Sequence, residues 1–188
     1  MSADNGNHIL EEPLMFDHIE VPEFPKKLVL GVQEDYCNLS CPKCLVFGTN
    51  KEPGFDIAQI ATSPMSMDNI IKILDEVKDA RPAVNPAYWV EPLVSKNFRK
   101  LVLEASSRDI PVAINTNGLL ITDKMATFLV EHLSAVSVSI DATTRETLKK
   151  TRSTDRLTAV KSAVFRLLEK RGSSKFPRIV VSFTVEDA

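Results

Sequence analysis

Hydrophobic and polar positions along the chain follow two periods in turn, which predicts alternating strands and helices. Short apolar runs rich in β-branched residues, typical of strands, occur at residues 27–33, 87–90, 111–115, 135–140 and 178–183. Apolar residues at helical spacing occur between them, at residues 67–80, 97–107, 123–132, 144–150 and 157–170. Strict alternation of this kind favours βα units and therefore an α/β fold with a parallel sheet.

Residues suited to helix ends support these boundaries. Ser66 and Thr122 are positioned to cap the helices that follow them, and Gly172 ends the last helix. Right-handed crossovers wind such a sheet in one direction, into a barrel or an open doubly wound sheet. Residues 1–26 contain three prolines and show no sustained periodicity. We therefore expect an N-terminal lead-in followed by a core of residues 27–188.

Composition and charge exclude several classes of protein. The chain has 188 residues, of which 44% are hydrophobic and 26% charged, as in ordinary globular domains. Its formal net charge of −2 argues against a general nucleic-acid-binding protein. No apolar run approaches the ~20 residues that span a bilayer, and the polar, acidic residues 1–13 are no secretory signal. We expect a cytoplasmic protein with no nucleic-acid or membrane partner.

All three cysteines lie directly after the first predicted strand, at the spacing C-x3-C-x2-C. They are Cys37, Cys41 and Cys44. An odd number of cysteines cannot pair completely within one chain, and clustering without an export signal indicates metal chemistry. Three thiolates can hold three corners of a cubane iron–sulfur cluster, or part of a zinc site. Zinc would need a fourth protein ligand, so a cluster with one open iron fits the count better.

The cysteine segment resembles the signature of the radical S-adenosylmethionine (radical SAM) superfamily. Lys43 stands where that family usually has an aromatic or hydrophobic residue. Asn38, Leu39 and Pro42 resemble the branch with a C-terminal cluster-binding extension, which includes peptide and sulfatase maturases. The resemblance covers residues 27–185 and implies a partial, TIM-like parallel βα barrel with about five of six strands present. The last strand lacks a covering helix, so we expect truncation at the C-terminus.

The segment after the second predicted strand resembles the family's Gly-Gly-Glu-Pro-Leu segment. Here it reads Trp-Val-Glu-Pro-Leu, at residues 89–93. By this match Glu91 would hold the methionyl amine of S-adenosylmethionine. Trp89 and Val90 replace the two glycines that allow close backbone approach. Without the cysteines, the favoured interpretation of Glu91 would be a surface carboxylate that precedes a proline.

The segments after the third and fourth predicted strands also resemble the family. Asn115 and Asn117 stand in an Asn-Thr-Asn-Gly segment similar to the family's Thr-Asn-Gly, and would lie near the cofactor. A Ser-Ile-Asp-Ala segment and a downstream arginine imply that Ser139 and Arg152 hold the methionyl carboxylate and that Asp141 lies close to the ribose. Each has a plainer interpretation: Asn-Gly as a turn, the aspartate as a helix cap, and the arginine as a solvated charge.

The resemblance implies an enzyme with a 4Fe–4S cluster and S-adenosylmethionine as cofactors. Reductive cleavage of S-adenosylmethionine would give a 5′-deoxyadenosyl radical that abstracts hydrogen from a substrate. The branch favours a peptide or protein side chain as substrate, while relatives act on sugars or small metabolites. An electron donor of the flavodoxin or ferredoxin type would be a partner. The alternative is a non-catalytic metal-binding module, either zinc-stabilised or a degenerate relative without cofactor binding, and the replaced glycines favour it.

Overall fold

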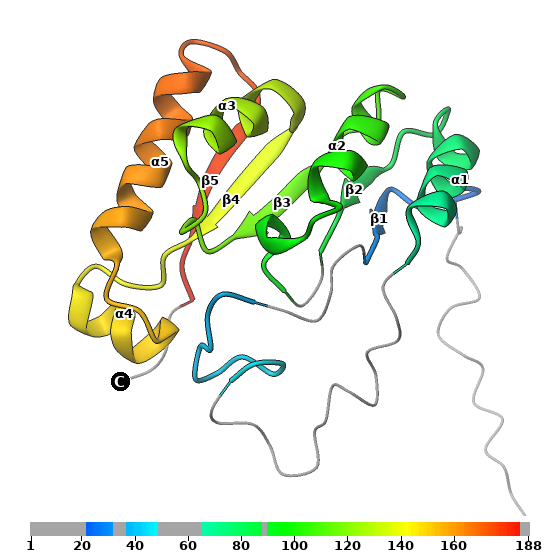
Figure 1. Ribbon diagram of the computed structural model, residues 1–188. Coiled ribbons are helices and arrows are strands. Elements are labelled where there is room, and N and C mark those ends of the chain that lie inside the picture. The colour runs from blue at the N-terminus through cyan, green and yellow to red at the C-terminus, as the bar shows by residue number, and fades with distance from the viewer. Residues whose placement is uncertain (1–21, 32–36, 49–64, 88–89, 185–188) are drawn as a thin grey trace, which may run out of the picture.

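The computed structural model describes residues 22–31, 37–48, 65–87 and 90–184 (Figure 1). Its strands are β1 (Lys27–Val29), β2 (Ala83–Asn85), β3 (Ala113–Thr116), β4 (Ala135–Ser139) and β5 (Arg178–Ser182). Its helices are α1 (Met67–Val77), α2 (Phe98–Ser106), α3 (Asp123–His132), α4 (Arg145–Arg152) and α5 (Leu157–Arg171), with a short 3-10 helix, η2, at Pro92–Val94. The predicted alternation of strands and helices is confirmed.

All strand pairs are parallel, and the strands form two small sheets. One sheet has the order β1-β2 and the other β3-β4-β5. A parallel bridge between Val84 and Val112 connects them, and the Val84 N–H donates to the Pro111 carbonyl at 2.8 Å. The strands therefore fan out as part of a barrel wall that does not close within the described residues (Figure 1). This confirms the partial, parallel α/β barrel that the sequence predicts.

Helices α1, α2, α3 and α5 cover one face of this wall (Figure 1). Their apolar stripes pack on the strands because helical spacing places every third or fourth side chain on one side. The largest fully buried side chains come from both layers and include Ile70, Leu74, Phe98, Leu101, Leu129, Val136, Val138 and Leu167. Each such side chain stabilises the fold by roughly 1.5–3 kcal/mol. The carboxyl ends of the strands are left facing the cysteine loop.

The helix caps follow the sequence expectation. The Ser66 hydroxyl accepts from the Asn69 N–H at 3.3 Å at the start of α1, and the Thr122 hydroxyl caps α3 in the same way. Gly172 is the C-cap of α5. Thr144 caps α4, so the alternative of Asp141 as a helix cap is wrong. The side chain of Asp141 is therefore available for other contacts.

The second predicted strand was misplaced. The apolar run predicts it at residues 87–90, of which 88–89 lie outside the described ranges, but β2 is Ala83–Asn85, between two prolines. Three residues give too short an apolar run to stand out, and β2 is defined by its register with β1, in which Lys27 pairs with Ala83. The Ala87 N–H donates to Asn85 Oδ1 at 3.1 Å, so the chain turns directly after β2. The first predicted strand is also shorter, ending at Val29.

Two further expectations concern the whole chain. The boundary between a lead-in of residues 1–26 and the core stays a prediction, since residues 1–21 lie outside the described ranges. Among the described helices none is long and apolar enough to cross a membrane.

Gly118 offers a test of the packing beneath the strand ends. It has φ +78°, and a Cβ there would lie 2.9 Å from Val138 Cγ1 and 3.4 Å from Val160 Cγ1. We expect Gly118→Ala to lower the free energy of unfolding by roughly 1–3 kcal/mol, measured by urea titration. Gly172→Ala serves as a comparison without a steric clash, because Gly172 has φ +58° and ψ −132°, which favour glycine, but nothing within 4 Å of a Cβ. An unchanged free energy of unfolding in Gly118→Ala would refute the argument.

Candidate functional site

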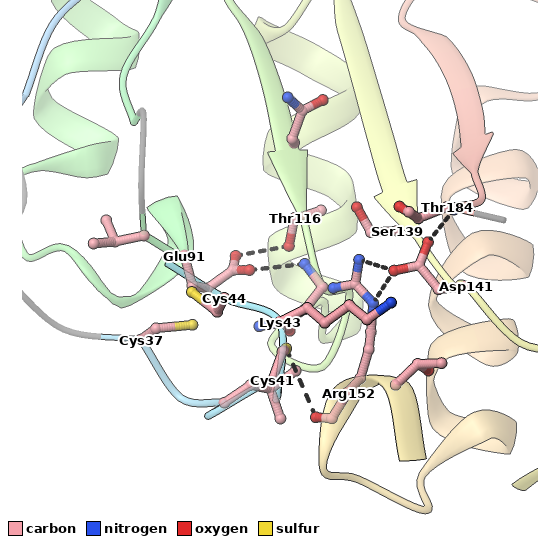
Figure 2. Close-up of a pocket in the computed structure, with 15 residues that line it drawn as sticks. Cys37, Cys41, Lys43, Cys44, Glu91, Thr116, Ser139, Asp141, Arg152 and Thr184 are labelled. Carbon is pink, nitrogen blue, oxygen red and sulfur yellow. Dashed lines mark hydrogen bonds and ion pairs between the residues drawn. The ribbon is translucent and has the colours of Figure 1, made fainter. Parts of the chain in front are cut away.

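The carboxyl ends of the strands surround a cavity of about 360 Å³. All nine side chains predicted for the site line it: Cys37, Cys41, Cys44, Glu91, Asn115, Asn117, Ser139, Asp141 and Arg152. They come from the cysteine loop, the loop before η2, the ends of β3 and β4, and the last turn of α4. Figure 2 shows the thiol-bearing loop on one side of the cavity and the Arg152 and Asp141 side chains on the other. The structure thus brings together residues up to 115 positions apart in sequence.

The cysteine loop is tightly wound. The Cys44 N–H donates to the Cys41 carbonyl at 2.9 Å, and the Gly48 N–H donates to the Cys44 carbonyl at 2.9 Å. A Cβ at Gly48 would lie 2.2 Å from that Cys44 carbonyl, so only glycine fits there. The Phe47 N–H donates to Cys44 Sγ at 3.4 Å. Backbone donors directed at sulfur suit a thiolate that binds metal.

The three thiols fit a cluster better than a single ion. All three are half-buried, unpaired and lie around one cavity. In the described part of the chain, no three Cys, His, Asp or Glu side chains gather closely enough to hold one metal ion. A zinc ion would need four ligands within about 2.3 Å of one point. Three thiolate donors at one cavity match in number the three corners of a cubane that protein ligands hold, with a fourth iron left open.

Burial raises the pKa of the Cys37 and Cys41 thiols above its ordinary value. The positive charge of Arg152 opposes this shift at Cys41, and a backbone hydrogen bond at Leu39 opposes it at Cys37. Since metals bind thiolates, metal binding must provide the free energy that removes these protons.

Glu91 is buried, with 3% of its surface exposed. Its Oε1 accepts from the Thr116 hydroxyl at 2.7 Å and from the Leu93 N–H at 3.3 Å. Its Oε2 accepts from the Asn117 N–H at 2.8 Å (Figure 2). Burial raises the pKa of Glu91, and the hydrogen bonds from Asn117, Thr116 and Leu93 oppose that shift. The alternative of a surface carboxylate is therefore wrong, and a buried acceptor faces the cavity.

Arg152 and Asp141 form an ion pair on the opposite side. Arg152 Nε donates to Asp141 Oδ2 at 2.7 Å, and its Nη2 contacts the same oxygen. The other carboxylate oxygen, Oδ1, accepts from the Thr184 N–H at 2.7 Å. Both side chains are largely buried, at 18% and 11% exposed. Arg152 is therefore not merely solvated, and Asp141 connects the end of β4 to the chain that follows β5.

The remaining predicted residues complete the rim. The Asn117 side-chain amide donates to Asn38 Oδ1 at 2.7 Å, and its oxygen accepts from the Leu119 N–H at 3.0 Å. The Ser139 hydroxyl accepts from Ser182 Oγ at 3.2 Å. Asn115 is exposed to the cavity and, within the described residues, forms no side-chain hydrogen bond.

Two residues that shape the site are not among the nine side chains that the sequence assigns to it. Thr116 lies between two predicted residues, and its hydroxyl is buried against Glu91. In a continuous strand the Thr116 side chain would point to the opposite face from those of Asn115 and Asn117. However, β3 ends at Thr116 and the chain turns there, so strand alternation no longer applies. Thr184 contributes a backbone N–H to Asp141, which no side-chain motif can signal.

Comparison with known proteins gives one family. The model of the Radical SAM superfamily matches residues 35–185. Over 98 residues the chain is 33% identical to the "tungsten-containing aldehyde ferredoxin oxidoreductase cofactor-modifying protein" of Pyrococcus furiosus. That match covers 50% of this chain and 25% of the relative, so the chain spans about a quarter of that protein.

Several solved structures have a similar fold. One is anSMEcpe with bound AdoMet (S-adenosylmethionine), with a TM-score of 0.63 and 18% identity over 82% of this chain and 42% of that one. BtrN in complex with AdoMet and 2-DOIA has a TM-score of 0.59 and 16% identity over 86% and 57%. Streptococcus suis SuiB has a TM-score of 0.59 and 17% identity over 78% and 31%. The chain spans about a third to somewhat over half of these proteins.

Proposed function

The chain belongs to the radical SAM superfamily, and on this premise we propose that Cys37, Cys41 and Cys44 hold its 4Fe–4S cluster beside a bound AdoMet. Radical SAM proteins use both groups as cofactors, and the structural relatives include complexes with AdoMet. The observation that carries the assignment is the single cavity that joins the three thiols to six other predicted side chains. Its volume of about 360 Å³ lies within the usual range of small-molecule sites.

When bound, the cluster and AdoMet supply a 5′-deoxyadenosyl radical that abstracts a hydrogen atom from a substrate. In our proposal the chain's own residues bind and orient AdoMet. Glu91 offers a buried carboxylate to the N–H groups of the methionyl amine, and three hydrogen bonds already fix its two oxygens. Ser139 and Arg152 receive the methionyl carboxylate on the opposite side, where Asp141 holds the guanidinium in place.

Asp141 would have a second role near the ribose. Its Oδ2 is occupied by Arg152 and its Oδ1 by the Thr184 N–H. A carboxylate oxygen has two lone pairs, and two Arg152 nitrogens contact Oδ2, so Oδ1 is the oxygen that keeps one acceptor site for a ribose hydroxyl. Asn115 and Asn117 would contribute amide groups to the adenosine side of the cavity. Their neutral side chains recognise hydroxyl and base edges without adding charge.

We propose a peptide or protein side chain as the substrate, with a small metabolite or sugar as the alternative. A second cavity of about 130 Å³ shares Asn115 with the first and is lined by strand residues such as Asn85 and Ser137. This position would let a substrate group reach AdoMet from the inner face of the barrel wall. Among the structural relatives, SuiB is described with its precursor peptide SuiA, and BtrN with the small ligand 2-DOIA.

The reaction requires an electron from a reductant, and we propose a flavodoxin or ferredoxin as the donor. Three unpaired thiols also suit a reducing compartment, which supports the cytoplasm as the place of action.

Electron paramagnetic resonance tests the proposal directly. Anaerobically reconstituted protein, reduced with dithionite, is expected to give the signal of a reduced cluster, because three thiolates can carry it. Adding AdoMet should change that signal, since its amine and carboxylate would bind at the open iron beside Glu91 and Arg152. A cluster signal that is indifferent to AdoMet would contradict cofactor binding. Stoichiometric zinc with no cluster would instead establish the metal-binding module.

A further inference from the structure

The cysteine loop rests on the last turn of α4. The Ser153 hydroxyl donates to the Ser40 carbonyl at 2.9 Å, and Cys41 Sγ lies 3.8 Å from the Arg152 carbonyl oxygen. These contacts join segments more than 110 residues apart in sequence. Ser153 therefore holds the loop at Ser40, the residue directly before Cys41, which is one of the proposed cluster ligands.

Ser153 has an unfavourable backbone conformation for a serine. Its φ is 54° and its ψ is 30°, in the left-handed region, at the C-cap of α4. Glycine is the usual residue at such helix ends, because a Cβ there costs free energy. The cap needs only the backbone, since the Ser153 N–H donates to the Lys149 carbonyl at 3.1 Å. What serine adds over glycine is the hydroxyl, and that hydroxyl contacts the cysteine loop.

The same turn also carries the cavity's arginine. Arg152 pairs with Asp141, which is itself left-handed at φ 53° and accepts from the Thr184 N–H. The end of α4 thus contacts the cysteine loop through Ser153. Through Arg152 it contacts Asp141, which lies after β4 and binds the chain that follows β5. The two halves of the cavity meet at these two consecutive residues.

We propose that Ser153 is a positioning residue, which fixes the cysteine loop against the end of α4 and so sets the place of Cys41 relative to Arg152. The proposal rests on the proposed function, because it concerns the loop that would hold the cluster. Ser153 itself does not line the main cavity. It acts through the Ser40 carbonyl.

Ser153→Gly separates this role from a structural one. Glycine keeps the left-handed cap at no steric cost and removes only the hydroxyl. We expect the midpoint of urea unfolding of the cluster-free protein to stay the same or rise. Iron loss from the reconstituted protein to a chelator should become roughly 2- to 10-fold faster, as the loss of one hydrogen bond implies. The AdoMet-induced change of the cluster's paramagnetic resonance signal should also shrink or shift.

Thr154→Ala is the matched control. Within the described residues its hydroxyl contacts only the Arg156 N–H, at 3.4 Å, in its own segment. This variant should retain iron as the unchanged protein does. If Ser153→Gly and the unchanged protein lose iron at the same rate and give the same signal, the inference is overturned while the proposed function stands. Equal iron loss in Thr154→Ala, or a lowered urea midpoint in Ser153→Gly, would also overturn it. A failure of the unchanged protein to hold a cluster would overturn the proposed function itself.

Discussion

Cys41→Ala is expected to abolish the iron–sulfur cluster. Cys41 is the middle thiol of the loop, and its Sγ lies 3.8 Å from the Arg152 carbonyl oxygen. A cubane of this kind is held by three protein thiolates. No other cysteine of this chain can take the place of Cys41, because the chain has only three cysteines. Iron after anaerobic reconstitution should fall from about four per chain to nearly none, together with the visible absorbance of the cluster.

Ser40→Ala is the control for this loss. Ser40 is the neighbouring residue in the same loop, its side chain is exposed, and its structural contact is made by its backbone carbonyl. It should bind as much iron as the unchanged protein. Unchanged iron content in Cys41→Ala would remove Cys41 from the ligand set and with it the cluster assignment.

Glu91→Gln is expected to weaken AdoMet binding strongly and to leave the cluster in place. The substitution keeps the shape of the side chain but removes the negative charge that would accept hydrogen bonds from the methionyl amine. It also places an amide N–H₂ where Glu91 now accepts hydrogen bonds from the Thr116 hydroxyl and the Asn117 N–H. Losing a hydrogen bond to a charged group costs about 1.5–3 kcal/mol, so the Kd for AdoMet should rise roughly 10- to 100-fold.

Anaerobic calorimetry of the reconstituted protein measures this Kd, and iron analysis shows whether the cluster remains. Glu76→Gln is the matched control, because Glu76 is exposed on α1, away from the cavity. It should bind AdoMet as the unchanged protein does. An unaltered Kd in Glu91→Gln would exclude Glu91 from the cofactor site.

Much of the site could be predicted because its chemistry follows the order of the strands. The three cysteines come after β1, and acidic, amide and hydroxyl side chains follow the later strands one by one. Parallel strands bring their carboxyl ends to one edge, so alternation alone implies that these residues meet. The cavity that all nine of them line is the geometric consequence.

The contacts between these residues could not be predicted. The pairing of Asp141 with Arg152 depends on the left-handed backbone at Asp141 and on the direction of α4, neither of which leaves a periodic signal. The misplaced second strand has a similar cause. Ala83–Asn85 is a strand because β1 lies beside it, and pairing of this kind is a tertiary effect that local propensity does not contain.

Glu91 connects the two sheets of the barrel wall at a place where few backbone contacts join them. The cysteine loop and Glu91 follow β1 and β2, whereas Thr116 and Asn117 follow β3 in the other sheet. Besides the bridge at Val84, the hydrogen bonds of the Glu91 carboxylate are cross-links between the two halves of the barrel wall. A ligand that contacts both halves would add to these cross-links, so part of its binding free energy would resist separation of the wall.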